Sequence, residues 1–281
     1  MRYFIIDNFI DNELCKKLMD AYSITNSSKN RKEIHGGREF LSSTTLEFYN
    51  LLKKSKDWKN LENKINSSEF LELCIKKLDL KEKKFSLVNF FKCENLTNIQ
   101  KLYKELSWTV SRFVSKKNLI IYFIIRVYRD ILRKIKFSRL FYPSKDAVEL
   151  LFDYSIAVNG YSRKIHRDSD SRLVVFILYL NTPSKTDTHE GGDFDIYKLV
   201  DGDENTGYPD KKNCEKIKSI KPESGKLVVF LNENDSFHGV EEMRNHSESR
   251  HFIYGGFTLL NKKNPHITNK SSVTTEFHLY D

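Results

Sequence analysis

Runs of β-branched and aromatic residues, each bounded by Gly, Asn, Asp or Ser, recur through the second half of the chain. They cover residues 150–158, 173–180, 226–231 and 250–259, and runs of this kind predict strands. In 173–180 both faces are apolar, which is typical of a strand buried on both sides. The pattern therefore predicts a β-rich core in this half.

In the first 93 residues, the pattern predicts one short strand followed by helices. Residues 4–10 predict that strand, and Asp11 can cap the helix that follows it. Apolar residues at helical spacing give this helix a packing stripe: Leu14, Leu18 and Tyr22. Ser67 can cap another helix, and such helices commonly support a β-sandwich from one side. Residues 34–39 are polar and rich in glycine, so we expect a surface turn there rather than a loop that faces substrate.

A basic segment separates these two halves. Residues 101–140 contain eleven Lys or Arg and only two acidic residues, a surplus that equals the net charge of +9 for the whole chain. Aliphatic residues alternate with these charges, so we expect a basic helical insert. It could dock on an anionic membrane surface or an acidic polymer, but packing on the core with a solvated basic face is slightly favoured. Nucleic acid is disfavoured as a partner, because no recognition motif for it is present.

Composition indicates a folded protein in a reducing compartment. Hydrophobic residues make up 39% of the 281 and aromatic residues 13%, which argues against disorder. The four cysteines, Cys15, Cys74, Cys93 and Cys214, show no C-x-x-C spacing, and we expect free thiols. No segment reaches the roughly 18 consecutive apolar residues of a membrane span, and the N-terminus does not resemble a signal peptide. We therefore expect a cytoplasmic protein without a transmembrane segment.

The chemistry is concentrated in an H-x-D pair, a distant histidine and an arginine. His166 and Asp168 precede His238, and Arg250 follows His238 by 12 positions. Two imidazoles and one carboxylate can bind one face of Fe(II) and leave the opposite face open for a chelating co-substrate and oxygen. An arginine placed shortly after the second histidine can form a two-pronged pair with a carboxylate of that co-substrate. H-x-D alone is a weak signal, and the flanking strand-like runs give it weight.

With its context, this pattern resembles the Fe(II)/2-oxoglutarate-dependent dioxygenases, specifically their prolyl-4-hydroxylase-like branch. The similar blocks are residues 160–168, 178–181, 190–194, 222–230 and 237–240, followed by Arg250. The resemblance implies that His166, Asp168 and His238 ligate iron. It also implies that Arg250 binds the distal carboxylate of 2-oxoglutarate, and that the hydroxyl of Tyr179 reaches the same carboxylate.

The resemblance also implies the fold class, mainly β with α. We expect a double-stranded β-helix (jelly roll) of about eight strands over residues 150–260, buttressed by N-terminal helices and carrying the basic insert. The expected divisions are an N-terminal strand and helical support region, the insert, the dioxygenase core and a C-terminal tail. Their boundaries are residues 1–93, 94–148, 149–262 and 263–281.

Several assignments stay open at this stage. Arg244 lies closer to His238, where the family's basic residue is usually found, and is an alternative to Arg250 for holding the co-substrate. Asp170 is a weak alternative ligand. The Gly255-Gly256 pair within a strand suggests that co-substrate or substrate approaches the backbone closely. The acidic stretch 201–210 lacks the spacing of a calcium loop and is expected to link two strands.

The implied activity is that of an oxidoreductase. It would hydroxylate an unactivated C–H bond and convert 2-oxoglutarate and O₂ into succinate and CO₂, with ascorbate as a candidate additional reductant. A prolyl or other peptidyl side chain is the family's best-known target, and a small molecule or sugar is the alternative. A cupin-like metal-binding jelly roll that is not an oxygenase would not need Tyr179 and Arg250 together. A binding module with a vestigial iron site would have no reason to keep the whole motif.

Overall fold

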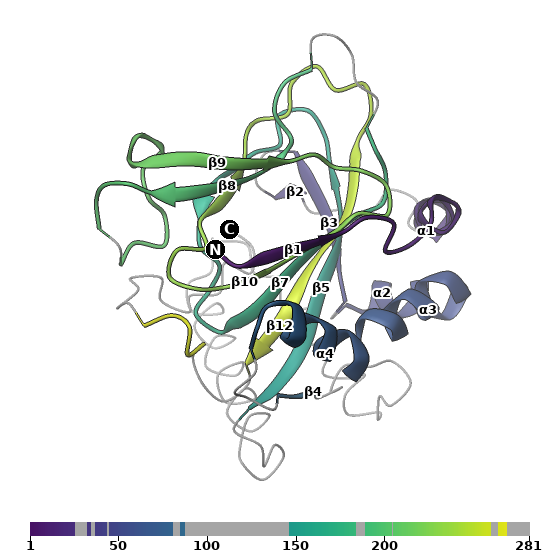
Figure 1. The fold of residues 1–281 in the computed structure, drawn as a ribbon. Coiled ribbons are helices and arrows are strands. Elements are labelled where there is room, and N and C mark those ends of the chain that lie inside the picture. The colour runs from purple at the N-terminus through teal and green to yellow at the C-terminus, as the bar shows by residue number, and fades with distance from the viewer. Residues whose placement is uncertain are drawn as a thin grey trace, which may run out of the picture.

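The computed structural model describes residues 1–25, 33–34, 37–43, 45–80, 85–87, 146–183, 189–203, 205–259 and 264–268. Within these residues, two mostly antiparallel β-sheets face each other and helices lie on one side of the larger sheet (Figure 1). The expected basic insert lies outside the described residues except for its last three, of which Ala147 and Val148 begin a strand, so its structure and its anionic partner stay predictions. None of the described helices is long and apolar enough to cross a membrane.

The larger sheet has eight strands, and they come from both halves of the chain. Seven of them run in the order β1 (Tyr3–Ile6), β10 (Leu227–Leu231), β7 (Arg172–Tyr179), β12 (Arg250–Leu259), β5 (Ala147–Ala157), β3 (Arg38–Ser42) and β2 (Glu33–Ile34). The eighth, β4 (Ser86–Leu87), pairs with β5 in parallel. The N-terminal region therefore adds strands to the core sheet as well as helices beside it.

The smaller sheet completes a sandwich. Its four strands run in the order β6 (Arg163–His166), β11 (His238–Val240), β8 (Phe194–Leu199) and β9 (Cys214–Ile220), and a short 3₁₀ helix, Lys211–Asn213, precedes β9. Strands β5 to β12 are the eight expected between residues 150 and 260. The prediction of a jelly roll with additional helices is thus confirmed for the described residues.

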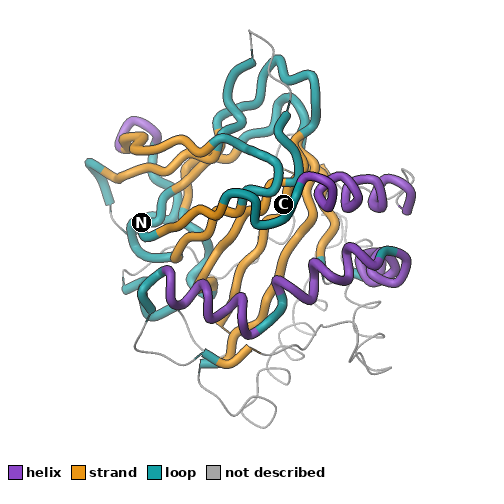
Figure 2. The backbone as a smooth tube through the Cα atoms, turned by 45° about the vertical axis from the view of Figure 1, so that its right-hand side comes forward, coloured by secondary structure: helices purple, strands orange, loops and turns teal. Residues whose placement is uncertain are grey.

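Four helices cover the outer face of the larger sheet: α1 (Asn12–Thr25), α2 (Leu46–Lys54), α3 (Lys56–Ile65) and α4 (Ser68–Lys77) (Figure 2). The predicted caps are present, because Asp11 Oδ1 accepts from the backbone N–H of Leu14 at 2.7 Å and Ser67 Oγ from that of Phe70 at 3.1 Å. The Phe70 ring packs edge-on against Phe176 of β7, with 5.7 Å between ring centres. Burial of such aromatic side chains fixes the helices on the sheet.

The inner faces of the two sheets enclose a second apolar cluster. Val175 and Phe230 of the larger sheet pack there with Phe194 and Ile196 of the smaller one. The central strands β7 and β10 therefore bury both of their faces, one under the helices and one inside the sandwich, which explains their continuous apolar runs in the sequence.

Three local expectations differ from the structure. The strand predicted over residues 4–10 ends at Ile6, because Asn8 takes a positive φ of 55° and turns the chain. The surface turn expected at 34–39 is present at Gly37, between β2 and β3, but is shorter than expected, because β3 begins at Arg38 and pairs with β5. The glycine pair faces packing partners rather than a ligand. A Cβ on Gly255 would lie 2.8 Å from the Phe176 ring, and one on Gly256 would meet the carbonyl of Val174 on the neighbouring strand.

Candidate metal and co-substrate site

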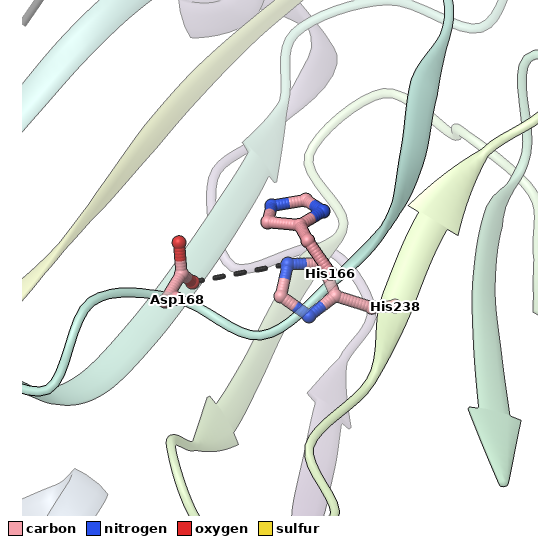
Figure 3. Close-up of side chains that lie close together, drawn as sticks. All are labelled: His166, Asp168 and His238. Atoms are coloured by element: carbon pink, nitrogen blue, oxygen red, sulfur yellow. Dashed lines mark ion pairs between the residues drawn. The ribbon is translucent and has the colours of Figure 1, made fainter. Parts of the chain in front are cut away.

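Two histidines from different parts of the chain meet at one end of the sandwich. His166 closes β6 and His238 opens β11, and the two residues pair directly across the small sheet. Their ring centres are 4.4 Å apart. Asp168 follows in the loop toward β7, and one ligand atom from each of the three residues lies within 4.8 Å of the others (Figure 3). All three side chains are buried, and the structure thus brings the whole H-x-D…H pattern together.

Backbone carbonyls fix how each imidazole is oriented. Nδ1 of His166 lies 2.8 Å from the carbonyl oxygen of Lys164, and Nδ1 of His238 lies 2.9 Å from that of Ser236. A carbonyl oxygen only accepts, so each Nδ1 carries the proton and donates it. Each Nε2 therefore keeps its lone pair, and a second partner that holds the imidazole in this way is typical of metal-ligating histidines.

The protonation states also suit a divalent metal. Burial lowers the pKa of His166 well below its usual value, and the neighbouring His238 and Arg163 also disfavour a proton on this ring. Burial lowers the pKa of His238 as well, although Asp168 opposes the shift. Burial opposes the ionisation of Asp168, but the charges of Arg172 and the histidines outweigh it and lower its pKa to about 2. Neutral imidazoles and an ionised carboxylate are the forms that bind a metal ion.

One carboxylate oxygen of Asp168 has no hydrogen-bond partner in this site. Oδ1 accepts from the Tyr254 hydroxyl at 2.6 Å, whereas the buried Oδ2 accepts no hydrogen bond from any described residue and lies 3.8 Å from Nε2 of His238. A buried, ionised oxygen without a partner is costly unless a cation binds it. Asp170, the alternative ligand, instead faces Arg167, 3.9 Å from its guanidinium, and is not part of the cluster. The donor set thus fits a divalent cation such as Fe(II).

A buried asparagine ties the two ligand loops together. Nδ2 of Asn232 donates to three carbonyl oxygens in the segment that begins at the carboxylate: those of Asp168, Ser169 and Arg172. Its Oδ1 accepts from the hydroxyl of Ser236, whose carbonyl orients the His238 ring. One side chain thus links the supports of two candidate ligands, and sequence reasoning did not single it out.

Replacing Asn232 with alanine is expected to weaken Fe(II) binding about 10- to 100-fold, the range for partners that orient metal ligands. The lost hydrogen bonds should also destabilise the fold by about 1–3 kcal/mol. Calorimetric titration with Fe(II) and denaturant unfolding would measure the two effects. Asn234→Ala is the matched control, because the Asn234 side chain bonds Thr268 at the surface. Equal losses in both variants would contradict this role.

Arg250 is a buried guanidinium with no acidic partner among the residues that the structure describes. It opens β12 and is only 3% exposed. Its Nη1 donates to the carbonyl of Gly192, whereas its Nε has no hydrogen-bond partner. The rings of Tyr161 and Phe252 lie 5.0 and 4.9 Å from the guanidinium carbon. A buried charge of this kind is unfavourable unless an anion binds it, so the geometry leaves room for a carboxylate.

Arg244 has the opposite surroundings. Its side chain is 59% exposed and pairs with Glu242 at 2.7 Å and with Glu190 at 3.7 Å. These carboxylates already neutralise its charge at the surface, and Arg244 does not line the pocket that contains Arg250. The geometry therefore favours Arg250 over Arg244 for binding a co-substrate.

Tyr179 ends β7, pairs with Phe252 of β12 and is buried. Burial raises the pKa of its hydroxyl, although the charge of Arg250 opposes the shift, so the hydroxyl stays protonated and can donate a hydrogen bond. Tyr179, Arg250 and both histidines line one pocket, so a single ligand could reach all four side chains.

Several other pocket residues were given no role in the site from the sequence. They are Arg38, Tyr161, Arg163 and Tyr254, together with apolar residues of both sheets. The 201–210 stretch does join β8 to the segment before β9, as expected. It also places the ring of Tyr208 in a stacked arrangement with His166, 5.9 Å between centres. No local sequence signal distinguished these residues, because their positions depend on how distant segments pair.

Comparisons with known proteins agree with this site. Residues 152–257 match the family model of the 2OG-Fe(II) oxygenase superfamily. No curated protein sequence matches the chain. Among solved structures, similar ones include a prolyl-4-hydroxylase of Pseudomonas putida, which is 15% identical over 92% of both chains with a TM-score of 0.39. A prolyl hydroxylase from Trichoplax adhaerens, in complex with a hypoxia inducible factor peptide fragment, is 12% identical over 92% of this chain and 84% of its own, with a TM-score of 0.44.

A viral collagen prolyl hydroxylase of Paramecium Bursaria Chlorella virus-1, solved in a truncated form, is also similar. It is 12% identical over 92% of this chain and 90% of its own, with a TM-score of 0.44. At these values the solved structures do not identify a substrate. The family match covers the candidate ligands, Tyr179 and Arg250, and residues 152–257 form a 2OG-Fe(II) oxygenase domain. Residues 152–257 thus carry a 2-oxoglutarate-dependent dioxygenase domain, whose cofactors are Fe(II), 2-oxoglutarate and O₂.

Proposed function

We propose that this dioxygenase hydroxylates an unactivated C–H bond, with His166, Asp168 and His238 as the iron ligands. In this proposal Arg250 holds the distal carboxylate of 2-oxoglutarate, and the hydroxyl of Tyr179 donates to the same group. The observation that carries it is the buried Arg250 guanidinium, which has a free Nε and no carboxylate partner among the described residues, in the pocket that also contains both histidines. A metal-binding jelly roll of another class would have no need for this buried charge.

Each residue has a defined task in this reaction. With iron and 2-oxoglutarate bound, O₂ would be the oxidant, and one of its oxygen atoms would enter the substrate and the other the succinate that forms together with CO₂. Tyr254 holds one oxygen of Asp168 and so points the other toward the histidines. Arg250 and Tyr179 would set the depth and orientation of the co-substrate. Ile177, Phe194 and Phe252 line the same space and limit the access of water.

The substrate is the less determined part of the proposal. A prolyl or other peptidyl side chain follows from the resemblance of the sequence to prolyl-4-hydroxylases, and a small molecule or sugar is the alternative. The role of ascorbate and the cytoplasmic location also stay predictions. The cupin-like alternative is disfavoured, because the matched family model is that of an oxygenase.

The direct test is conversion of 2-oxoglutarate to succinate by the purified chain, with and without Fe(II), and with panels of candidate peptides, glycans and small acids. We expect slow, iron-dependent succinate formation without substrate and faster formation with the correct one. Calorimetry without oxygen should show 2-oxoglutarate binding that depends on the metal. A chain that binds Fe(II) but neither binds nor converts 2-oxoglutarate would contradict the proposal.

A further inference from the structure

The pocket carries more positive charge than the proposed co-substrate requires. Its lining includes three guanidinium groups, those of Arg38, Arg163 and Arg250, and none of the described residues that line it is acidic. The distal carboxylate of 2-oxoglutarate accounts for Arg250. Two cations, one from each sheet, therefore face the remaining space.

Arg38 enters the pocket from the larger sheet. Strand β5 has β3 on one side and β12 on the other, and both Arg38 and Arg250 pair with Ala157. The two arginines thus stand in one row, with backbones on the order of 10 Å apart from the usual spacing of strands. The Arg38 guanidinium lies 5.6 Å from the Phe252 ring centre and 5.7 Å from that of Tyr254. The Arg38 guanidinium is therefore close to both rings, and Tyr254 in turn donates a hydrogen bond to Asp168.

The charge of Arg38 is only partly neutralised. Its nitrogen atoms donate to the hydroxyl of Ser155 at 2.9 and 3.1 Å, and the carboxylate of Asp153 lies 3.8 Å away. Asp153 also faces the charge of Arg172, so one carboxylate is shared by two guanidinium groups.

Arg163 enters from the smaller sheet. An irregularity in the pairing of β6 with β11 lies between the positions of Arg163 and His166. It brings Nη2 of Arg163 to 3.5 Å from Nε2 of His166, where the guanidinium donates to the lone pair that a metal ion would take. No carboxylate pairs with Arg163 among the described residues. A guanidinium this close to a divalent cation is repelled, unless an anion lies between or beside them.

We propose that Arg38 and Arg163 bind an anionic group of the substrate, a carboxylate or a phosphate, close to the C–H bond that is hydroxylated. The proposal rests on the proposed function, because it takes Arg250 as occupied by 2-oxoglutarate. Guanidinium groups on facing walls can each donate two hydrogen bonds to an oxyanion, which fixes both its position and its orientation. The preferred substrate is thus acidic near the reacting carbon rather than a neutral prolyl group.

Matched pairs of small probes test this proposal. The protein is loaded with Zn(II), which supports no turnover, and saturated with 2-oxoglutarate so that Arg250 is occupied. Binding of N-acetyl-aspartate amide is compared with that of N-acetyl-asparagine amide, and binding of N-acetyl-phosphoserine amide with that of N-acetyl-serine amide, by calorimetry or NMR. We expect the charged member of at least one pair to bind about 10-fold tighter, the range for a charge-assisted hydrogen bond. We call the difference in affinity between the charged and the neutral member of a pair the charge margin. A charge margin in the aspartate pair indicates a carboxylate site, and one in the phosphoserine pair indicates a phosphate site.

Variants then locate the effect. Arg38→Gln and Arg163→Gln should each remove most of the charge margin. The corresponding lysine variants should keep part of it, because lysine keeps the positive charge but lacks the planar, two-pronged guanidinium. Lys164→Gln is the matched control, since Lys164 is exposed on the same strand as Arg163. Thermal unfolding of each variant checks that the fold is intact.

Two results would overturn the proposal. One is equal binding of charged and neutral probes by the wild type with 2-oxoglutarate bound. The other is a loss of the charge margin in Lys164→Gln as large as that in Arg163→Gln. Such a result would mean that the margin comes from long-range electrostatic attraction and not from contact with Arg163. Failure of the wild type to bind 2-oxoglutarate at all would instead contradict the proposed function, so the two failures are distinguishable.

Discussion

Replacing Asp168 with asparagine is expected to abolish iron-dependent turnover of 2-oxoglutarate while the fold survives. The change removes the only ionised ligand of the cluster and leaves two neutral imidazoles, which hold Fe(II) weakly. Partners that merely orient ligands cost about 10- to 100-fold in metal affinity, so a ligand itself should cost more than that. His166→Ala and His238→Ala should have the same effect. Calorimetric titration with Fe(II) and an assay for succinate would measure it.

The fold should survive because Asp168 lies in the loop between β6 and β7 and belongs to neither apolar cluster. Asp170→Asn is the matched control, since it removes the same charge two residues away. Asp170 faces Arg167 instead of the histidines, so this variant should keep its iron affinity and its turnover. Full activity in Asp168→Asn together with inactivity in Asp170→Asn would move the ligand assignment to Asp170.

The core strands were predictable because each carries its own local signal. The apolar run at 250–259 coincides with β12, and the run at 226–231 differs from β10 by one residue. The candidate ligands were found for a related reason. His166 and His238 each stand beside such a run, and the pairing of β6 with β11 then places them opposite each other. Helix caps at Asp11 and Ser67 were likewise readable from neighbouring residues.

The two arginines of the proposed anion site were not predictable in this way. Arg38 reaches the pocket because β3 pairs with β5, a contact between residues more than a hundred positions apart. Arg163 and His166 are three positions apart, and regular alternation along a strand would place them on opposite faces. The irregularity in the pairing of β6 with β11 brings the two side chains together instead. No residue in the sequence indicates that irregularity.

Gly255 and Gly256 also show what a local pattern in the sequence can and cannot predict. Their small size correctly indicated that something approaches the backbone closely, but the identity of the partner depends on tertiary packing. Phe152 and Phe176 occupy the space beside Gly255, on the helix-covered face of the sheet. Small residues within one strand indicate that a neighbouring group packs close to the backbone. Which group this is depends on how the helices and sheets pack together.

Arg250→Lys is expected to weaken 2-oxoglutarate binding by about 1.5–3 kcal/mol, roughly 10- to 150-fold, the range for a hydrogen bond to a charged group. Lysine keeps the charge but loses the planar fork that would hold a carboxylate with two bonds. Tyr179→Phe removes one neutral partner and should cost less, about 1 kcal/mol. Calorimetry with Fe(II)-loaded protein in the absence of oxygen would measure both affinities.

The matched control for this prediction is Arg244→Lys. Arg244 is exposed and paired with Glu242 and Glu190, so its replacement should leave 2-oxoglutarate binding unchanged. In Arg250→Lys, iron affinity should be retained, because no ligand of the cluster contacts this arginine in the described residues. A selective loss of co-substrate affinity with intact metal binding is therefore the expected signature. Unchanged 2-oxoglutarate affinity in Arg250→Lys, with a loss in Arg244→Lys, would transfer the role to the surface arginine.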